Sequence, residues 1–291
     1  MKNNKYEIDM CNGTLMDKLI SFSLPLMLSG ILQLLFNAVD IIVVGRFTGS
    51  QALAAVGSTT ALINIFTNLF IGISLGANVL AARFYASGKE KEMSETVHTS
   101  ITLALISGLV MALAGVLLAR FALNLMGTPN DVIDQSVLYM RIYFLGMPFF
   151  MLYNYGAAIL RAVGDTKRPL FFLVISGMTN AVLNLVLVIV FHMGVAGVAI
   201  GTIVSQLISS ILVLRCLYTS NTSYRLYFSK LGIKTQYLKQ IFQVGIPAGI
   251  QSTVINLSNA LLQSSVNSFG SVAMAGYTAA NNIFGFLYMS V

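Results

Sequence analysis

The chain has 291 residues, of which 56% are hydrophobic and only 9% are charged, and its formal net charge is +7. An average soluble domain has roughly 25% charged residues, and a soluble fold of this size could not cover its surface with so few charges. These figures argue against a soluble enzyme, a nucleic-acid binder, a disulfide scaffold and a disordered chain. They indicate an integral membrane protein.

Long apolar runs follow one another along the chain, and most exceed the ~20 residues that a helix needs to cross a bilayer. The strict alternation of a membrane β-barrel is absent, so we expect helices. The sequence therefore predicts an all-α polytopic membrane protein whose eight spans cover roughly residues 19–44, 53–82, 97–118, 137–160, 170–191, 195–214, 240–268 and 275–291.

The basic residues alternate with these runs. Of the 17 Lys and Arg residues, 14 lie in the N-terminal segment and in the second-to-third, fourth-to-fifth and sixth-to-seventh connections. The positive-inside rule places that side in the cytoplasm. We therefore expect a multi-pass protein of the cell membrane with a cytoplasmic N-terminus and no signal peptide, and we attribute the net charge to topology and not to a nucleic-acid partner.

The first and seventh runs resemble each other. Pro25 and Asn37-Ala38 recur as Pro247 and Asn259-Ala260, both 222 residues later, and Gly49-Ser50 recurs as Gly270-Ser271 at an offset of 221. A six-helix unit repeated in parallel is the plan of two-lobed transporters that rock about a central cleft. We expect a six-helix N-terminal lobe at 1–219, a cytoplasmic inter-lobe linker at 220–239 and the first two helices of an incomplete C-terminal lobe at 240–291. A complete second copy would need about 444 residues, so we expect a C-terminally truncated chain.

Glycine pairs spaced four residues apart predict close helix packing within a lobe. They are Gly72/Gly76, Gly197/Gly201 and Gly245/Gly249.

Only Asp40 and Arg141 are charged residues well inside the predicted spans. A charge at mid-bilayer costs roughly 2.5–3.5 kcal/mol on insertion scales. Asn184 on the fifth span and Thr202 on the sixth span each lie roughly 10 Å from the outer end of their helix, near the level of Asp40. Asn180 lies one turn deeper, on the same face as Asn184. We interpret these four residues as a cation or proton site. The alternative is that the amides and the hydroxyl only join helices.

Arg141 and Asp40 each allow two roles. We expect Arg141 to reach lipid headgroups or loop carbonyls, although it could pair with Asp40. The Asp40 carboxyl group could carry a proton from one face to the other, or it could ligate Na⁺ as a metal site, and the sequence does not separate these roles.

Four motifs together resemble the multidrug and toxic compound extrusion (MATE) transporters. They are Asn37-Ala38-Val39-Asp40 through Gly45, Tyr139-Met140-Arg141-Ile142 with Gly146 and Pro148, Arg161 through Pro169, and Gly194 through Gly197 with Gly201-Thr202. The resemblance implies a twelve-helix, two-lobed antiporter that exports organic, often cationic compounds in exchange for H⁺ or Na⁺. It implies no cofactor and no need for an oligomer.

The resemblance also implies roles for single residues. Asp40 would be the coupling carboxylate, and Asn180, Asn184 and Thr202 would complete its cation site. Many members carry an acid where this chain has Asn184, and one subgroup carries a Glu where this chain has Ile255, so the N-terminal lobe site is favoured. The possible substrate-cleft or hinge residues are Pro25, Asn37, Tyr139, Arg141 and Asn154.

Three other functions fit the sequence less well. A flippase for a lipid-linked saccharide is the main alternative, but it would want a strongly cationic cleft, and the spans offer only Arg141. An intramembrane enzyme is disfavoured because His98 and His192 fall at span ends and no Walker-type glycine loop is present. A 291-residue chain acting alone would lack half of any central cleft, so transport would then be improbable.

Overall fold

The ordered elements of the chain are helices. A computed structural model describes residue 8 and residues 14–289, and no β-strand occurs in that part. In chain order the elements are α1 (Leu15–Phe47), α2 (Ser50–Ala86), α3 (Glu90–Leu125), α4 (Ile133–Leu145), α5 (Met147–Ala162), α6 (Lys167–Leu185), the π-helical turn η1 (Val186–Val190), α7 (Gly194–Thr219), the 3₁₀ turn η2 (Phe228–Lys230), α8 (Thr235–Asn267) and α9 (Ser271–Met289). The predicted all-α membrane fold is confirmed, and each predicted run contains a helix or a helix pair.

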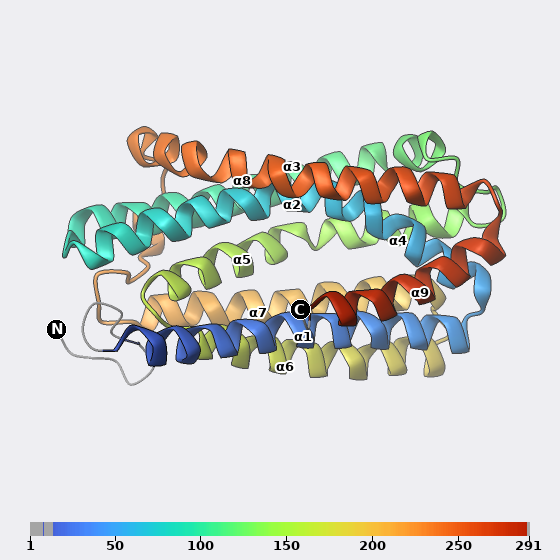
Figure 1. The fold of residues 1–291 in the computed structure, drawn as a ribbon, viewed down its shortest axis with the longest axis horizontal. Coiled ribbons are helices and arrows are strands. Elements are labelled where there is room, and N and C mark those ends of the chain that lie inside the picture. Colours follow the sequence, from blue (N-terminus) through green and yellow to red (C-terminus); the bar gives the residue numbers. More distant parts are fainter. Residues whose placement is uncertain (1–7, 9–13, 290–291) are drawn as a thin grey trace.

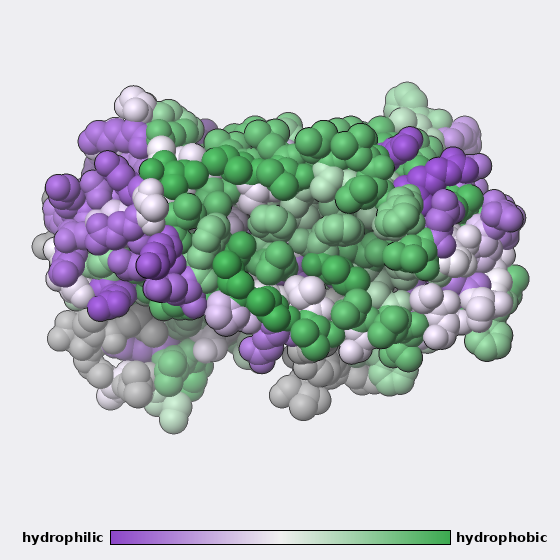
Figure 2. All heavy atoms as spheres, turned by 90° about the horizontal axis from the view of Figure 1, so that it is seen from above, coloured by the Kyte–Doolittle hydropathy of each residue, from purple (hydrophilic) through white to green (hydrophobic). Residues whose placement is uncertain are grey.

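The helices lie along one long axis and alternate in direction, so the connections gather at two ends (Figure 1). We call one of these the basic end; it holds the connections 87–89, 163–166 and 220–234 and the start of α1. Hydrophobic residues cover most of the middle of the surface in Figure 2, and hydrophilic residues gather near both ends. A bundle that is apolar in the middle and polar at its ends suits a bilayer.

Five helices of the described chain are long and apolar enough to cross a membrane, and the α4–α5 pair would add a sixth. That pair is bent by 49° at Gly146, although the sequence predicts one continuous run there. Pro148 lies in the first turn of α5, where its missing N–H costs nothing. Over the described residues, neither α8 nor α9 is both long enough and apolar enough to count as a spanning helix. α8 carries Gln and Ser side chains along much of its length, which lowers its hydropathy.

Two glycine pairs join the predicted lobes and do not pack within them. Gly72 and Gly76 on α2 face Gly249 and Gly245 on α8, so that a Cβ atom on Gly72 would overlap the backbone of Gly249. We call these four residues the glycine seam. The prediction of packing within a lobe is wrong for both pairs. A spacing of four predicts that one helix face is flat, but it does not predict which helix packs against that face. The third pair does pack inside residues 1–219, since Gly201 lies against the side chain of Asn184.

The seam yields a first testable result. Gly72→Leu should lower the thermal unfolding midpoint of the detergent-purified protein by several degrees, because overpacking costs typically ~1–3 kcal/mol. Gly276→Leu on α9 is the matched control, since a Cβ atom there meets no atom of the described chain within 4 Å beyond its chain neighbours and its own helix backbone. Equal midpoints for the two variants would contradict the close approach of α2 and α8.

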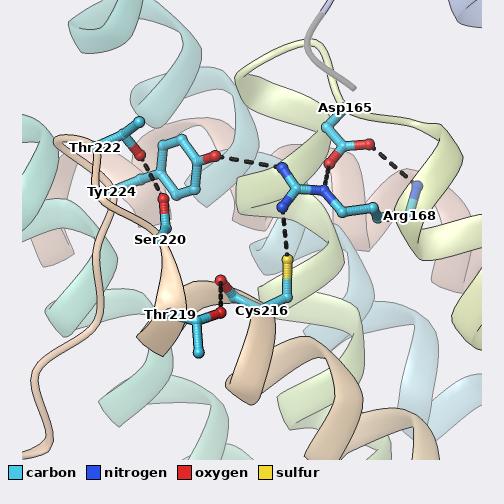
Figure 3. Close-up of polar contacts among 7 residues, drawn as sticks. All are labelled: Asp165, Arg168, Cys216, Thr219, Ser220, Thr222 and Tyr224. Atoms are coloured by element: carbon cyan, nitrogen blue, oxygen red, sulfur yellow. Dashed lines mark hydrogen bonds and ion pairs between the residues drawn. The ribbon is translucent and has the colours of Figure 1, made fainter. Parts of the chain in front are cut away.

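The connection between α5 and α6 is held by a buried ion pair (Figure 3). Asp165 is fully buried and accepts a hydrogen bond from Arg168 Nε, and the backbone N–H of Arg168 donates to its other oxygen at 3.1 Å. Arg168 Nη1 donates to Cys216 Sγ at 3.1 Å, and Nη2 donates to the Tyr224 hydroxyl at 3.4 Å. One guanidinium therefore ties this connection to α7 and to the segment that follows it.

Candidate cation site

Three helices supply the residues of the candidate site. Asp40 comes from α1, Asn180 and Asn184 come from α6, and Thr202 comes from α7. α6 packs against both α1 and α7, so its polar face lies between the other two contributors. The two asparagines are four residues apart and share that face. η1 follows α6 directly, and π-turns of this kind are frequent at functional sites.

One chain of hydrogen bonds connects the four side chains. The amide nitrogen of Asn184 donates to an Asp40 carboxylate oxygen and, at 3.3 Å, to the amide oxygen of Asn180. The amide nitrogen of Asn180 donates to the Thr202 hydroxyl at 3.4 Å. That hydroxyl donates to the carbonyl oxygen of Val198 at 3.0 Å. Asn184 is therefore the link between the only acid of this network and the neutral groups on α6 and α7.

The four side chains of the network differ in how deeply they are buried. Asn184 is fully buried and Asn180 is 5% exposed, whereas Asp40 and Thr202 are half-buried. The amide oxygen of Asn184 is buried without a hydrogen-bond partner in the described chain. It lies against Gly201, where any larger side chain would collide with it. A buried amide oxygen normally has a partner, so this atom is free to accept one.

The oxygens of the network suit a small cation or a proton. A carboxylate, amide oxygens and a hydroxyl are hard ligands of the kind that oxygen-seeking cations take in proteins. The same carboxylate can accept a proton. The other three residues of the site lie 140 to 162 positions after Asp40 in the chain. Only the packing of α6 between α1 and α7 brings the four residues together.

The other candidate residues lie outside this network. Pro25 is buried within α1, where its carbonyl oxygen accepts a hydrogen bond from Ser29 at 2.7 Å. Asn37 is exposed on α1. The side-chain amide of Asn154 donates to the Phe150 carbonyl of its own helix at 2.8 Å. None of the three donates to or accepts from the four residues of the site.

Arg141 does not pair with Asp40 in the structure. Its side chain is exposed, and its Nε donates to the carbonyl oxygen of Val116 on α3 at 3.2 Å. Of the two expected roles of Arg141, contact with a carbonyl oxygen is the one observed, although this carbonyl belongs to a helix and not to a loop.

Tyr139 has a neighbour that the sequence reading missed. Tyr139 is buried, and its ring centroid lies 5.9 Å from that of Tyr143. Asp40 lies within electrostatic reach of both phenol groups. The signal that could have found Tyr143 is its spacing of four residues from Tyr139, which puts both rings on one helix face.

The sequence is similar to known multidrug transporters. The profile of the family described as MatE matches residues 25–186. The "Probable multidrug resistance protein YoeA" of Bacillus subtilis is 34% identical over 277 residues, which cover 92% of this chain and 59% of the relative. The "Multidrug export protein MepA" of Staphylococcus saprophyticus is 21% identical, covering 89% of this chain and 57% of the relative. The chain thus spans less than two thirds of the length of these relatives.

Solved structures share the fold. The inward-facing conformation of a multidrug resistance MATE family transporter of the MOP superfamily superposes with a TM-score of 0.79 at 23% identity, over 89% of this chain and 61% of that one. The outward-facing conformation of such a transporter gives 0.80 at 21% identity, over 98% and 68%. At these identities the likeness concerns the fold alone.

Proposed function

The chain belongs to the MatE family of membrane transporters, and from that premise we propose that the complete protein is a secondary active antiporter that exports organic, often cationic compounds in exchange for H⁺ or Na⁺. The relatives named above are described as multidrug resistance and multidrug export proteins. The observation that carries the coupling part of the proposal is the Asn184 amide, which joins the Asp40 carboxylate to Asn180.

Coupling follows from the charge of Asp40. Binding of H⁺ or Na⁺ neutralises the carboxylate and changes which hydrogen bonds the Asn184 amide makes with it. A ligand shifts a two-state equilibrium only by its differential affinity for the two states. The outward- and inward-facing states therefore differ in how the helices α1, α6 and α7 present oxygens to the cation. The membrane potential adds about 2.3 kcal/mol per charge per 100 mV.

The arrangement of the lobes supports the same proposal. We take residues 1–219 as the first lobe, 220–239 as the linker and 240–291 as the start of a second lobe. In the structure, α8 packs on α2, and α9 packs on α2 and α1. The basic end faces the cytoplasm of the cell, since its connections hold the excess of Lys and Arg. Asp40 lies seven residues before Phe47, the last residue of α1, which puts it about 10 Å from the outer end of that helix.

Asn184→Ala tests the role of the amide bridge. In membrane vesicles that carry the complete protein, this variant should slow cation-driven drug transport at least ~10-fold, because the Asp40 carboxylate loses a hydrogen bond, and a hydrogen bond to a charged group is worth about 1.5–3 kcal/mol. Asn68→Ala is the matched control, since it too removes a side-chain amide, but a partly buried one that donates to the backbone carbonyl of Asn64 in its own helix at 2.7 Å and not to an acid. Imposing a pH gradient and a Na⁺ gradient in separate vesicles identifies the coupling ion. Equal rates for Asn184→Ala and Asn68→Ala would refute the bridge.

A further inference from the structure

Aromatic and cationic side chains form a cluster at the basic end, just after α7. Arg225 lies 5.1 Å from the ring centroid of Tyr227 and 6.0 Å from that of Tyr218. The Lys230 ammonium lies 4.8 Å from the Tyr227 centroid. The rings of Tyr218 and Phe228 are 5.6 Å apart. We call these five residues the aromatic–cation cluster.

The cluster is fixed on the bundle by α3. The backbone N–H of Tyr227 donates to Nε2 of His98 at 3.0 Å, and the two rings are stacked with an interplanar angle of 12°. Nδ1 of His98 lies 2.6 Å from the Ser94 carbonyl oxygen, which sets the tautomer that leaves Nε2 as an acceptor. The backbone N–H of Lys234 donates to the Thr99 hydroxyl at 3.3 Å. The segment that carries the cations is therefore held in place before any ligand binds.

The positive charge of the cluster is not balanced by a carboxylate. Both ion pairs of the described chain lie elsewhere, at Arg120–Asp134 and Arg168–Asp165. Asp165 is the last acidic residue of the sequence, so no Asp or Glu occurs in the segment itself. The Nε atom of Arg225 is buried and has no hydrogen-bond partner in the described chain. The buried Nε cannot reach a ligand, but a guanidinium that two rings orient and that forms neither ion pair of the described chain is suited to phosphate.

The cluster also presents an apolar edge. Phe228 is 54% exposed and Tyr218 is 46% exposed. Tyr218 lies in the last turn of α7, one of the helices that is long and apolar enough to span a membrane. The cluster therefore lies at the level where that span ends and where headgroups begin. Exposed aromatic rings are favoured at this level, where one side is apolar and the other is wet.

We propose that the aromatic–cation cluster binds the phosphate group of an anionic phospholipid of the adjacent leaflet. Arg225 and Lys230 bind the phosphate, and Phe228 and Tyr218 contact the upper part of the acyl chains. Basic residues beside a membrane span are attracted to anionic lipids. A free phosphate ion would match the two cations but would leave the exposed rings without a contact. Since the cluster lies on the segment between the predicted lobes, the bound lipid holds that segment to the membrane surface.

The test measures lipid affinity directly. The purified protein is placed in phosphatidylcholine nanodiscs that contain increasing fractions of phosphatidylglycerol, and the bound phosphatidylglycerol is counted by native mass spectrometry. Arg225→Gln/Lys230→Gln should weaken phosphatidylglycerol binding about 10-fold, since each cation near an anionic surface contributes to the attraction. Arg215→Gln/Lys239→Gln removes the same charge from exposed sites outside the cluster and should change the affinity less than about twofold. An equal loss in both double variants would show diffuse attraction only and would overturn the proposal.

Two further measurements test the proposal even if the double variant does not fold. Lys230→Gln alone alters an exposed side chain and keeps the contacts of the backbone, so it should fold even if the double variant does not. It should weaken phosphatidylglycerol binding about threefold, and an unchanged affinity would overturn the proposal. Inorganic phosphate, added at constant ionic strength, should not displace phosphatidylglycerol from the wild-type protein. Displacement would assign the cluster to a free anion and would also overturn the lipid assignment.

Discussion

Asp40→Asn should abolish gradient-dependent dye efflux from cells that express the complete protein. Asn is nearly isosteric with Asp and can keep a hydrogen bond to Asn184, but it carries no charge and takes up no proton. The variant therefore removes the charge through which H⁺ or Na⁺ acts on the lobes, along with the ~2.3 kcal/mol per 100 mV that the membrane potential supplies for each charge. Efflux is measured by the fall in intracellular dye fluorescence, before and after the gradient is collapsed.

Asp17→Asn is the matched control for this experiment. Asp17 is on the same helix but is exposed near its start, where it accepts a hydrogen bond from the Thr14 hydroxyl at 2.6 Å. Its efflux should equal that of the wild type at equal abundance in the membrane. If Asp40→Asn also exported dye at the wild-type rate, and did so only with a gradient, the carboxylate would have no part in coupling.

Arg168→Leu should be among the most destabilising single substitutions in the chain. It leaves Asp165, which is fully buried, without its cation. It also removes the donors to Cys216 and Tyr224. Removing one partner of a buried ion pair costs roughly 3–5 kcal/mol, because a buried charge stays uncompensated. The expected result is a large drop in the thermal unfolding midpoint of the detergent-purified protein and a low yield of monodisperse protein.

The chain offers an exposed ion pair for comparison. Arg120 Nη1 lies 3.4 Å from an Asp134 oxygen, and both side chains are well exposed. Arg120→Leu should therefore cost only about 0.2–1 kcal/mol. The double variant Asp165→Asn/Arg168→Leu should recover part of the lost stability, because it removes the uncompensated carboxylate. Equal midpoints for Arg168→Leu and Arg120→Leu would contradict the buried pair.

The positions of the helices could be predicted from the sequence because bilayer thickness alone dictates the length of an apolar run. The break in the fourth run could not be placed with that argument. A run of apolar residues reads as continuous, whereas Gly146 fits against Ile203 of α7, where a Cβ atom would lie 2.8 Å from the Ile203 side chain. The absence of a side chain at Gly146 leaves room for this close approach at the bend between α4 and α5. The π-turn after Asn184 gave no sequence signal either.

The same contrast holds for the candidate site and the glycine seam. Helix periodicity put Asn180 and Asn184 on one face, and depth along the spans put Asp40 and Thr202 near one level. Periodicity could not show that Asn184 donates to Asp40 and Asn180 at once. Nor could it show that Asn154 binds its own helix. The glycine spacing predicted flat faces on α2 and α8, but it did not predict that these two faces pack against each other.

The sequence by itself determined the membrane class, the order of the apolar helices, and the residue types that reach the middle of the bundle. These features depend on hydropathy, charge and helical period, which are local properties of the chain. The tertiary structure decided which faces meet, which donor meets which acceptor, and which cations near the basic end lie against aromatic rings and not in an ion pair. Those features depend on side chains that are far apart in sequence and come within hydrogen-bond distance only when the helices pack.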